Sequence, residues 1–126
     1  DIQLIIIDGL QLMEAGRAEN KQQETSWILS DLKVLARELN VPVVVVYQLN
    51  RSVETREGHT PGIYDLRESG FIEQDADVVI LLHREDYYDP TKKRGEVDLT
   101  IAKQKNGPTG QITLKFQQKF LRFENF

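Results

Sequence analysis

Two runs of apolar residues stand out along the chain. The first is Leu4 to Ile7, which ends abruptly in the carboxylate of Asp8, and the second is Val41 to Val46. They predict strands at roughly 3–8 and 42–48. A continuous apolar run is typical of a strand that is buried on both faces of a parallel sheet. The segment between them has room for a crossover helix. The pattern therefore predicts a right-handed βαβ unit.

The intervening segment carries apolar residues at helical spacing. These residues are Ile28, Leu32, Leu35 and Leu39, with Trp27 and Val34 widening the stripe. Asn20 followed by Gln23 resembles a capping box, so we expect the helix to begin near Lys21. Asn40 and Pro42 are expected to end it.

The second half of the chain reads differently. Residues 50–77 are polar, with two short helices expected around 63–67 and 71–76, and residues 86–95 resemble a surface excursion. Further strands are expected at 78–83, 97–103, 111–117 and 120–124. The last three alternate between apolar and polar residues, which favours antiparallel pairing. The sequence therefore predicts an α/β fold in which antiparallel C-terminal strands extend a parallel central sheet.

Composition narrows the class of protein. The chain has 126 residues, 40% of them hydrophobic and 29% charged, as in an ordinary globular domain. It has no cysteine, which excludes disulfides and thiolate metal sites. A net charge of −4 gives no overall attraction to nucleic acid, so such binding would need local basic residues. The chain begins directly on a strand, and we expect it to be a fragment of a larger domain.

Two polar residues follow the predicted parallel strands. Ligands bind beyond the carboxyl ends of strands in such sheets, where Asp8 is expected. A carboxylate there can hold a magnesium ion that bridges phosphates, or it can cap a turn. Gln48 is expected at the same edge, one strand over. Its amide can sense a phosphate oxygen, or it can simply face solvent.

Two other segments could contact phosphates. Arg67 and Glu68 precede Gly70 in a charged loop, where an arginine and close backbone amides can grip a sugar–phosphate chain. The alternative is a pair of solvated charges at a helix end. Lys103 and Lys105 lie two residues apart on a predicted strand and so share a face. They can reach a phosphate, or they can protect a solvated edge strand.

Other chemistry is poorly supported. The carboxylates at positions 73, 75 and 77 lack a histidine nearby, and we favour capping and pairing with basic groups over a metal site. His59 and His83 show no metal-ligand spacing, and no Gly-x-Ser-x-Gly elbow is present. The chain also contains no Gly-x-x-x-x-Gly-Lys-Ser/Thr phosphate loop, so it is not expected to cradle a triphosphate or hydrolyse ATP alone.

A series of ordered motifs carries a family resemblance. They are Leu4 to Met13, Leu35 to Val43, Gln48 to Arg51, Asp65 to Gly70, Ile72 to Asp77, Ala102 to Gly110 and Arg122 to Asn125. Together they closely resemble the C-terminal half of the RecA-like motor domain of DnaB-type replicative DNA helicases. The resemblance covers essentially all of residues 1–126, and the Asp-Leu-Arg-Glu-Ser-Gly block makes it specific.

The resemblance implies a homohexameric ring that uses ATP and Mg²⁺ to unwind duplex DNA while moving on single-stranded DNA. It implies that Asp8 is the Walker B residue that binds magnesium and that Gln48 links the γ-phosphate to the DNA loops. The resemblance also implies a cytoplasmic location, in the bacterial nucleoid or the plastid stroma, no membrane association, and a primase and a helicase loader as partners.

The same resemblance assigns the remaining site residues. Arg67, Glu68 and Gly70 would line the central channel and bind the DNA backbone. Lys103 and Lys105 would reach the ATP of the adjacent subunit.

Two positions depart from the family pattern. Lys105 lies where the family usually has an arginine finger. Such an arginine raises the rate of ATP or GTP hydrolysis roughly 10³–10⁵-fold in related enzymes, and a lysine lacks the planar guanidinium fork of an arginine. Gly9 replaces a tyrosine and is expected to loosen the loop that leaves Asp8. The alternatives are a RecA-type recombinase or repair ATPase, a less favoured kinase-like phosphoryl transferase, and a remnant that only binds DNA or a partner without catalysis.

Overall fold

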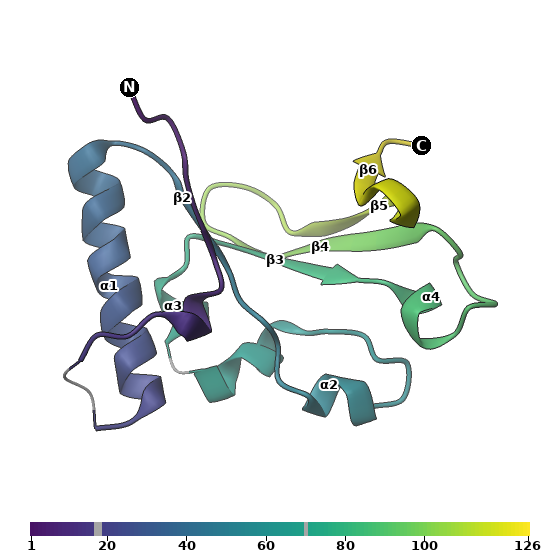
Figure 1. Ribbon diagram of the computed structural model, residues 1–126, viewed down its shortest axis with the longest axis horizontal. Helices are drawn as coiled ribbons and strands as arrows, with labels where there is room; N and C mark the ends of the chain where they lie inside the picture. The colour runs from purple at the N-terminus through teal and green to yellow at the C-terminus, as the bar shows by residue number, and fades with distance from the viewer. Residues whose placement is uncertain (17–18, 70) are drawn as a thin grey trace. The chain divides into compact units, whose positions relative to one another are not determined.

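The computed structural model describes residues 1–16, 19–69 and 71–126, with the backbone alone at 67–69 (Figure 1). Its elements in chain order are β1 (Ile5–Asp8), η1 (Leu10–Leu12), α1 (Lys21–Leu39), β2 (Val43–Val46), α2 (Ser52–Thr55), η2 (Ile63–Ser69), α3 (Ile72–Asp75), β3 (Val78–His83), α4 (Glu85–Tyr88), β4 (Glu96–Gln104), β5 (Gly110–Gln117), η3 (Gln118–Phe120) and β6 (Arg122–Glu124). They form two compact units, residues 1–50 with 66–76 and residues 51–65 with 77–126.

The first unit contains the predicted βαβ unit. Strands β1 and β2 pair in parallel, with Ile5 opposite Val43, and α1 connects them (Figure 1). The side chain of Asn20 accepts a hydrogen bond from the backbone N–H of Gln23 at 2.9 Å, which fixes the start of α1 at Lys21. Asn40 ends the helix in the left-handed conformation, with φ of 52°. Both predicted ends of the helix are confirmed.

Burial in the first unit differs from the sequence prediction. The strands alternate between half-buried and exposed positions, and Ile6, Val44 and Val46 on one face are exposed. The prediction of strands buried on both faces is therefore wrong for this chain. Trp27 and Val34 are also exposed, whereas Ile28 on the same helix is buried. The buried face of α1 is therefore narrower than the stripe of apolar residues in its sequence. The buried apolar residues here are Leu10, Ile28, Leu66 and Ile72.

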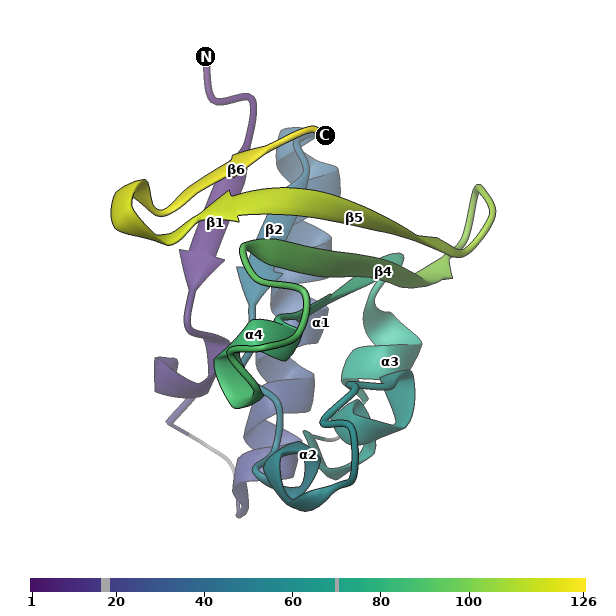
Figure 2. The same ribbon diagram turned by 90° about the vertical axis from the view of Figure 1, so that its right-hand side faces the viewer.

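The second unit is built on an antiparallel sheet with strand order β3-β4-β5-β6. Figure 2 shows β4, β5 and β6 side by side. Its core contains Val79, Leu81 and Val97, which is 2% exposed. The fold is α/β, with a parallel sheet plus antiparallel strands, as predicted. Among the described residues the hydrogen-bond ladders form two sheets, however, because no ladder joins β1 or β2 to β3, β4, β5 or β6.

The short elements show the limits of pattern analysis. Helix η2 and helix α3 lie where short helices are predicted, although η2 is longer and is a 3-10 helix. The single turns α2 and α4 are not predicted, since four residues are too few to show a helical period. Within the described residues, no helix is long and apolar enough to cross a membrane.

Candidate functional site

The carboxyl ends of β1 and β2 form one edge of the parallel sheet. The register places Asp8, the last residue of β1, opposite Val46, the last residue of β2. The side chain of Asp8 is exposed there, and Gln48 follows Val46 by two residues and is also exposed. The sheet therefore brings the ends of both segments to the same edge, as expected from the sequence. The roles of the two side chains stay predictions.

The backbone that leaves Asp8 forms a tight turn. Gly9 is buried and has φ of 113°, a conformation that L side chains rarely adopt. Leu10 follows at 2% exposure. The backbone N–H of Leu12 then donates to the carbonyl oxygen of Gly9 at 3.0 Å. The glycine therefore permits a hydrogen-bonded turn at this point of the chain, and the expectation that Gly9 loosens the loop stays a prediction.

The charged loop begins at an ion pair that the sequence analysis missed. Arg56 donates two hydrogen bonds to the carboxylate of Asp65, at 2.6 and 3.2 Å, and the backbone N–H of Gly62 donates a third at 2.7 Å. The hydrogen bonds from Arg56 hold the pKa of Asp65 below its usual value. Arg56 also lies over the ring of Tyr64, 4.8 Å from its centre. Asp65 therefore anchors the chain just before the loop.

The predicted DNA-binding residues follow this anchor. Arg67 and Glu68 belong to η2, of which the structure describes only the backbone at these positions, and Gly70 lies outside the described residues. Their contact with DNA stays a prediction.

The two lysines do not share one strand as expected. Lys103 lies in β4 opposite Val79, whereas Lys105 follows the strand in a turn. The side chain of Lys105 forms an ion pair with Asp77, with Nζ 2.8 Å from Oδ1. Alternation along a strand therefore does not set the direction of the Lys105 side chain, because β4 ends at Gln104.

Two lysines contact the acidic segment at positions 73, 75 and 77, one through a backbone carbonyl and one through a carboxylate. Lys33 donates to the backbone carbonyl of Asp75 at 2.6 Å, and Asp77 binds Lys105. Across residues 1–16, 19–69 and 71–126, no three histidine, cysteine or acidic side chains gather as a metal site would require. The preference for capping and pairing over a metal site stays a prediction.

Two more carboxylates of the second unit are held by basic partners. Arg84 donates to Asp86 at 3.0 and 3.2 Å, and these hydrogen bonds lower the pKa of Asp86. Burial raises the pKa of Asp98, but hydrogen bonds from Lys93 at 2.8 Å and Thr113 at 2.7 Å outweigh it, so that the net shift is downward. These pairs stabilise the charged form of both carboxylates.

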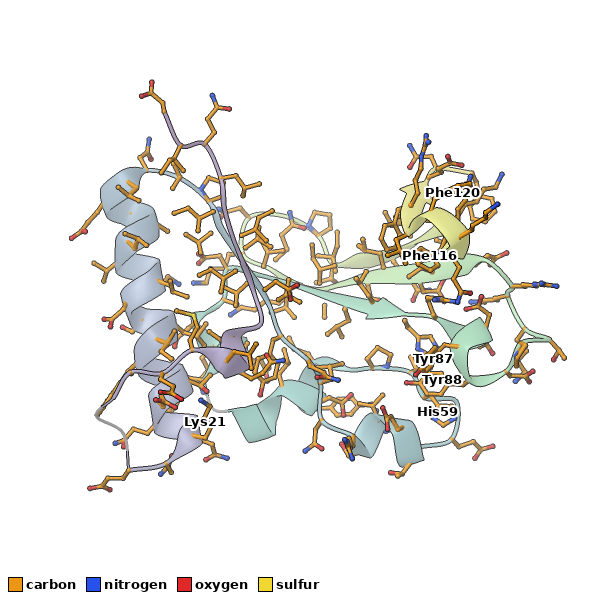
Figure 3. All side chains as sticks on the ribbon, viewed as in Figure 1. Lys21, His59, Tyr87, Tyr88, Phe116 and Phe120 are labelled. Carbon is orange, nitrogen blue, oxygen red and sulfur yellow. The ribbon has the colours of Figure 1, made fainter. Side chains whose placement is uncertain are left out.

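The rings of His59 and His83 both lie near the ring of Tyr88. The distance between the two histidines along the chain gave no sign of this contact. The ring of His59 stacks on Tyr88 with centres 4.0 Å apart (Figure 3). The centre of the His83 ring lies 6.1 Å from that of the same tyrosine. Burial lowers the pKa of His83 and raises the pKa of Tyr88. The stack is an aromatic contact within the second unit, as the short distances between the ring centres show.

Comparison with known proteins finds relatives along almost the whole chain. The family model described as the DnaB-like helicase C terminal domain matches residues 1–125. The replicative DNA helicase DnaB of Leifsonia xyli is 52% identical over 124 residues, which cover 97% of this chain and 27% of that protein. The replicative DNA helicase DnaB of Geobacillus stearothermophilus is 50% identical, with 97% of this chain and 28% of that protein covered.

Solved structures agree with the sequence matches. A structure described as a DnaB-like replicative helicase and its interactions with primase superposes with a TM-score of 0.91 and 42% identity, covering 98% of this chain and 30% of that one. A second solved structure, described as an ATPase domain, superposes with a TM-score of 0.92 and 42% identity, covering 98% of this chain and 44% of that one. The chain spans little more than a quarter of the length of the two curated relatives.

Proposed function

This chain belongs to the family of DnaB-like helicase C-terminal domains, and we propose that it works as part of the ATP-driven motor of a replicative DNA helicase. The complete protein unwinds duplex DNA by moving along single-stranded DNA, and residues 1–126 form the C-terminal part of its RecA-like ATPase domain. The family match over residues 1–125 is the observation that carries the proposal.

Asp8 is the residue that we assign to magnesium. Mg²⁺ in nucleotide sites takes one or two carboxylates together with phosphate oxygens and water. A single exposed carboxylate at the carboxyl edge of a parallel sheet fits that donor set. When bound with ATP, the ion neutralises charge on the phosphate oxygens. The turn at Gly9 and Leu10 orients the backbone that carries Asp8.

Gln48 is the residue that we assign to coupling. It lies at the same edge as Asp8, so its amide can donate to a phosphate oxygen of ATP bound there. Nucleotide state then reaches the loop with Arg67, Glu68 and Gly70, which binds the DNA backbone. The ion pair between Arg56 and Asp65 holds the chain directly before this loop.

Lys103 and Lys105 are assigned to the neighbouring subunit's ATP, where their charges stabilise the transferring phosphoryl group. This assignment requires a homohexameric ring, in which each nucleotide lies between two subunits. The other partners that we propose are a primase and a helicase loader, and the proposed location is the cytoplasm, in the bacterial nucleoid or the plastid stroma.

Substitution of Gln48 in the complete helicase tests the coupling role. Gln48→Ala is expected to keep magnesium-dependent ATP hydrolysis and to lower the number of base pairs unwound per ATP, because the amide that reports the phosphate is gone. Unwinding of a labelled fork and phosphate release are measured on the same samples. Gln3→Ala is the matched control, since Gln3 is an exposed glutamine before the amino end of β1.

Two outcomes decide the matter. If Gln48→Ala unwinds as many base pairs per ATP as the unsubstituted helicase, Gln48 does not couple hydrolysis to motion. If electron micrographs of the complete protein on single-stranded DNA show open filaments instead of closed rings, a RecA-type recombinase or repair ATPase is the better assignment.

A further inference from the structure

Asp77 and Lys105 contact each other twice. They flank the first cross-strand pair of β3 and β4, in which Val78 faces Gln104. The backbone N–H of Lys105 donates to the carbonyl oxygen of Asp77 at 3.0 Å. The ammonium of Lys105 donates to the carboxylate of the same residue at 2.8 Å. One residue therefore holds both the backbone and the side-chain end of the lysine.

A β-bulge lies three residues before Lys105. Val79 faces Lys103 while Ile80 faces Ile101, so Ala102 is an extra residue on β4. An extra residue bends the strand and changes the direction of the side chains that follow it. The bulge therefore sets the direction in which the chain leaves β4. The contacts with Asp77 then fix the position of Lys105 after the strand has ended.

The ion pair between Asp77 and Lys105 is exposed to solvent, which limits its contribution to folding stability. The side chain of Lys105 is 46% exposed and that of Asp77 is 62% exposed. Exposed ion pairs contribute little to folding stability, because water and salt screen both charges. They also exchange readily with other partners in solution. The pair is therefore better suited to orienting a flexible lysine than to stabilising the second unit.

We propose that Asp77 is a positioning residue that orients the Lys105 ammonium for the phosphate of ATP bound to the neighbouring subunit. This inference rests on the proposed function of Lys105. A lysine carries a compact charge on a long, flexible stem, without the rigid fork of an arginine. Held by the carboxylate, the ammonium is already confined when a phosphate arrives, and it passes from one anion to the other.

Asp77→Asn in the complete helicase tests the inference. The asparagine keeps the size of the side chain and the carbonyl that receives the Lys105 N–H, and it removes only the charge. We expect kcat for DNA-stimulated ATP hydrolysis to fall about tenfold, as when a catalytic group is misplaced, with KM changed less than about twofold. Glu85→Gln is the matched control, because it removes an acidic partner of another exposed lysine, Lys92, in the same unit.

The Lys105→Ala background separates positioning from structure. There Asp77→Asn is expected to have no further effect on kcat, since the group that it positions is absent. Ring assembly, measured by native mass spectrometry, is expected to be unchanged in all variants.

The outcomes distinguish the two claims. If Lys105→Ala leaves kcat unchanged, the proposed role of Lys105 fails and the positioning role fails with it. If Lys105→Ala lowers kcat but Asp77→Asn leaves it unchanged or raises it, only the positioning inference is overturned. An Asp77→Asn effect that persists in the Lys105→Ala background also overturns it, because the aspartate then acts without the lysine.

Discussion

Leu10 and Leu12 provide a matched pair of substitutions within one turn of 3-10 helix. Leu10 is 2% exposed, whereas Leu12 is 81% exposed. Leu10→Ala removes three buried carbons, each contributing about 0.8 kcal/mol of transfer free energy, and leaves a cavity. The expected loss in the free energy of unfolding is about 3 kcal/mol, within the range of roughly 2–5 kcal/mol for buried leucines. Leu12→Ala is expected to change it by less than about 0.5 kcal/mol.

Urea denaturation of the 126-residue chain measures this difference. Trp27 is the only tryptophan and lies on α1 in the same unit, so its fluorescence follows the unfolding of that unit. With a slope of about 1 kcal/mol per molar urea, the midpoint for Leu10→Ala moves down by roughly 2–3 M. Equal midpoints for the two variants, or the absence of a cooperative transition in the unsubstituted chain, would refute the assignment of Leu10 to a formed core.

Two further predictions concern local hydrogen bonds. Asn20→Ala removes the cap of α1 and is expected to cost about 1 kcal/mol in the same urea experiment, while Asn20→Ser, which keeps a capping oxygen, costs less. The pKa values of Asp65, Asp86 and Asp98 are lowered in the folded chain, so the stability that these carboxylates add is complete above their unfolded pKa of about 3.9 and is lost as pH falls through the folded values. Acid titration followed by circular dichroism checks this, and a second unit that is equally stable at pH 5 and pH 3 would contradict it.

Local patterns were sufficient for much of the fold. The apolar spacing and the Asn20 and Asn40 signals predicted α1 and both of its ends, because caps and helical periods depend on neighbouring residues. The two apolar runs predicted β1 and β2, and their parallel pairing follows from the helix between them. The ordered motifs also predicted the family, which the comparisons confirm.

Residues distant in sequence account for most of what was missed. Arg56 and Asp65 form their ion pair across a loop, and His59 meets Tyr88 across 28 intervening residues (Figure 3). No periodic signal marks such partners, since their contact depends on how loops pack. Burial was also misjudged. Ile6 and Trp27 are apolar but exposed in this chain, because burial depends on which elements pack against a residue and not on its type alone.

The sequence by itself determined α1, the strands, and which carboxylate and amide lie at the edge of the parallel sheet, since these depend on residue type and spacing. It did not determine the single turns α2 and α4. Only the tertiary structure decided that Lys105 leaves β4 and binds Asp77. That outcome depends on the bulge at Ala102 and on the register of β3 against β4. A single extra residue in one strand changes the partners of every side chain beyond it, and no local pattern records that shift.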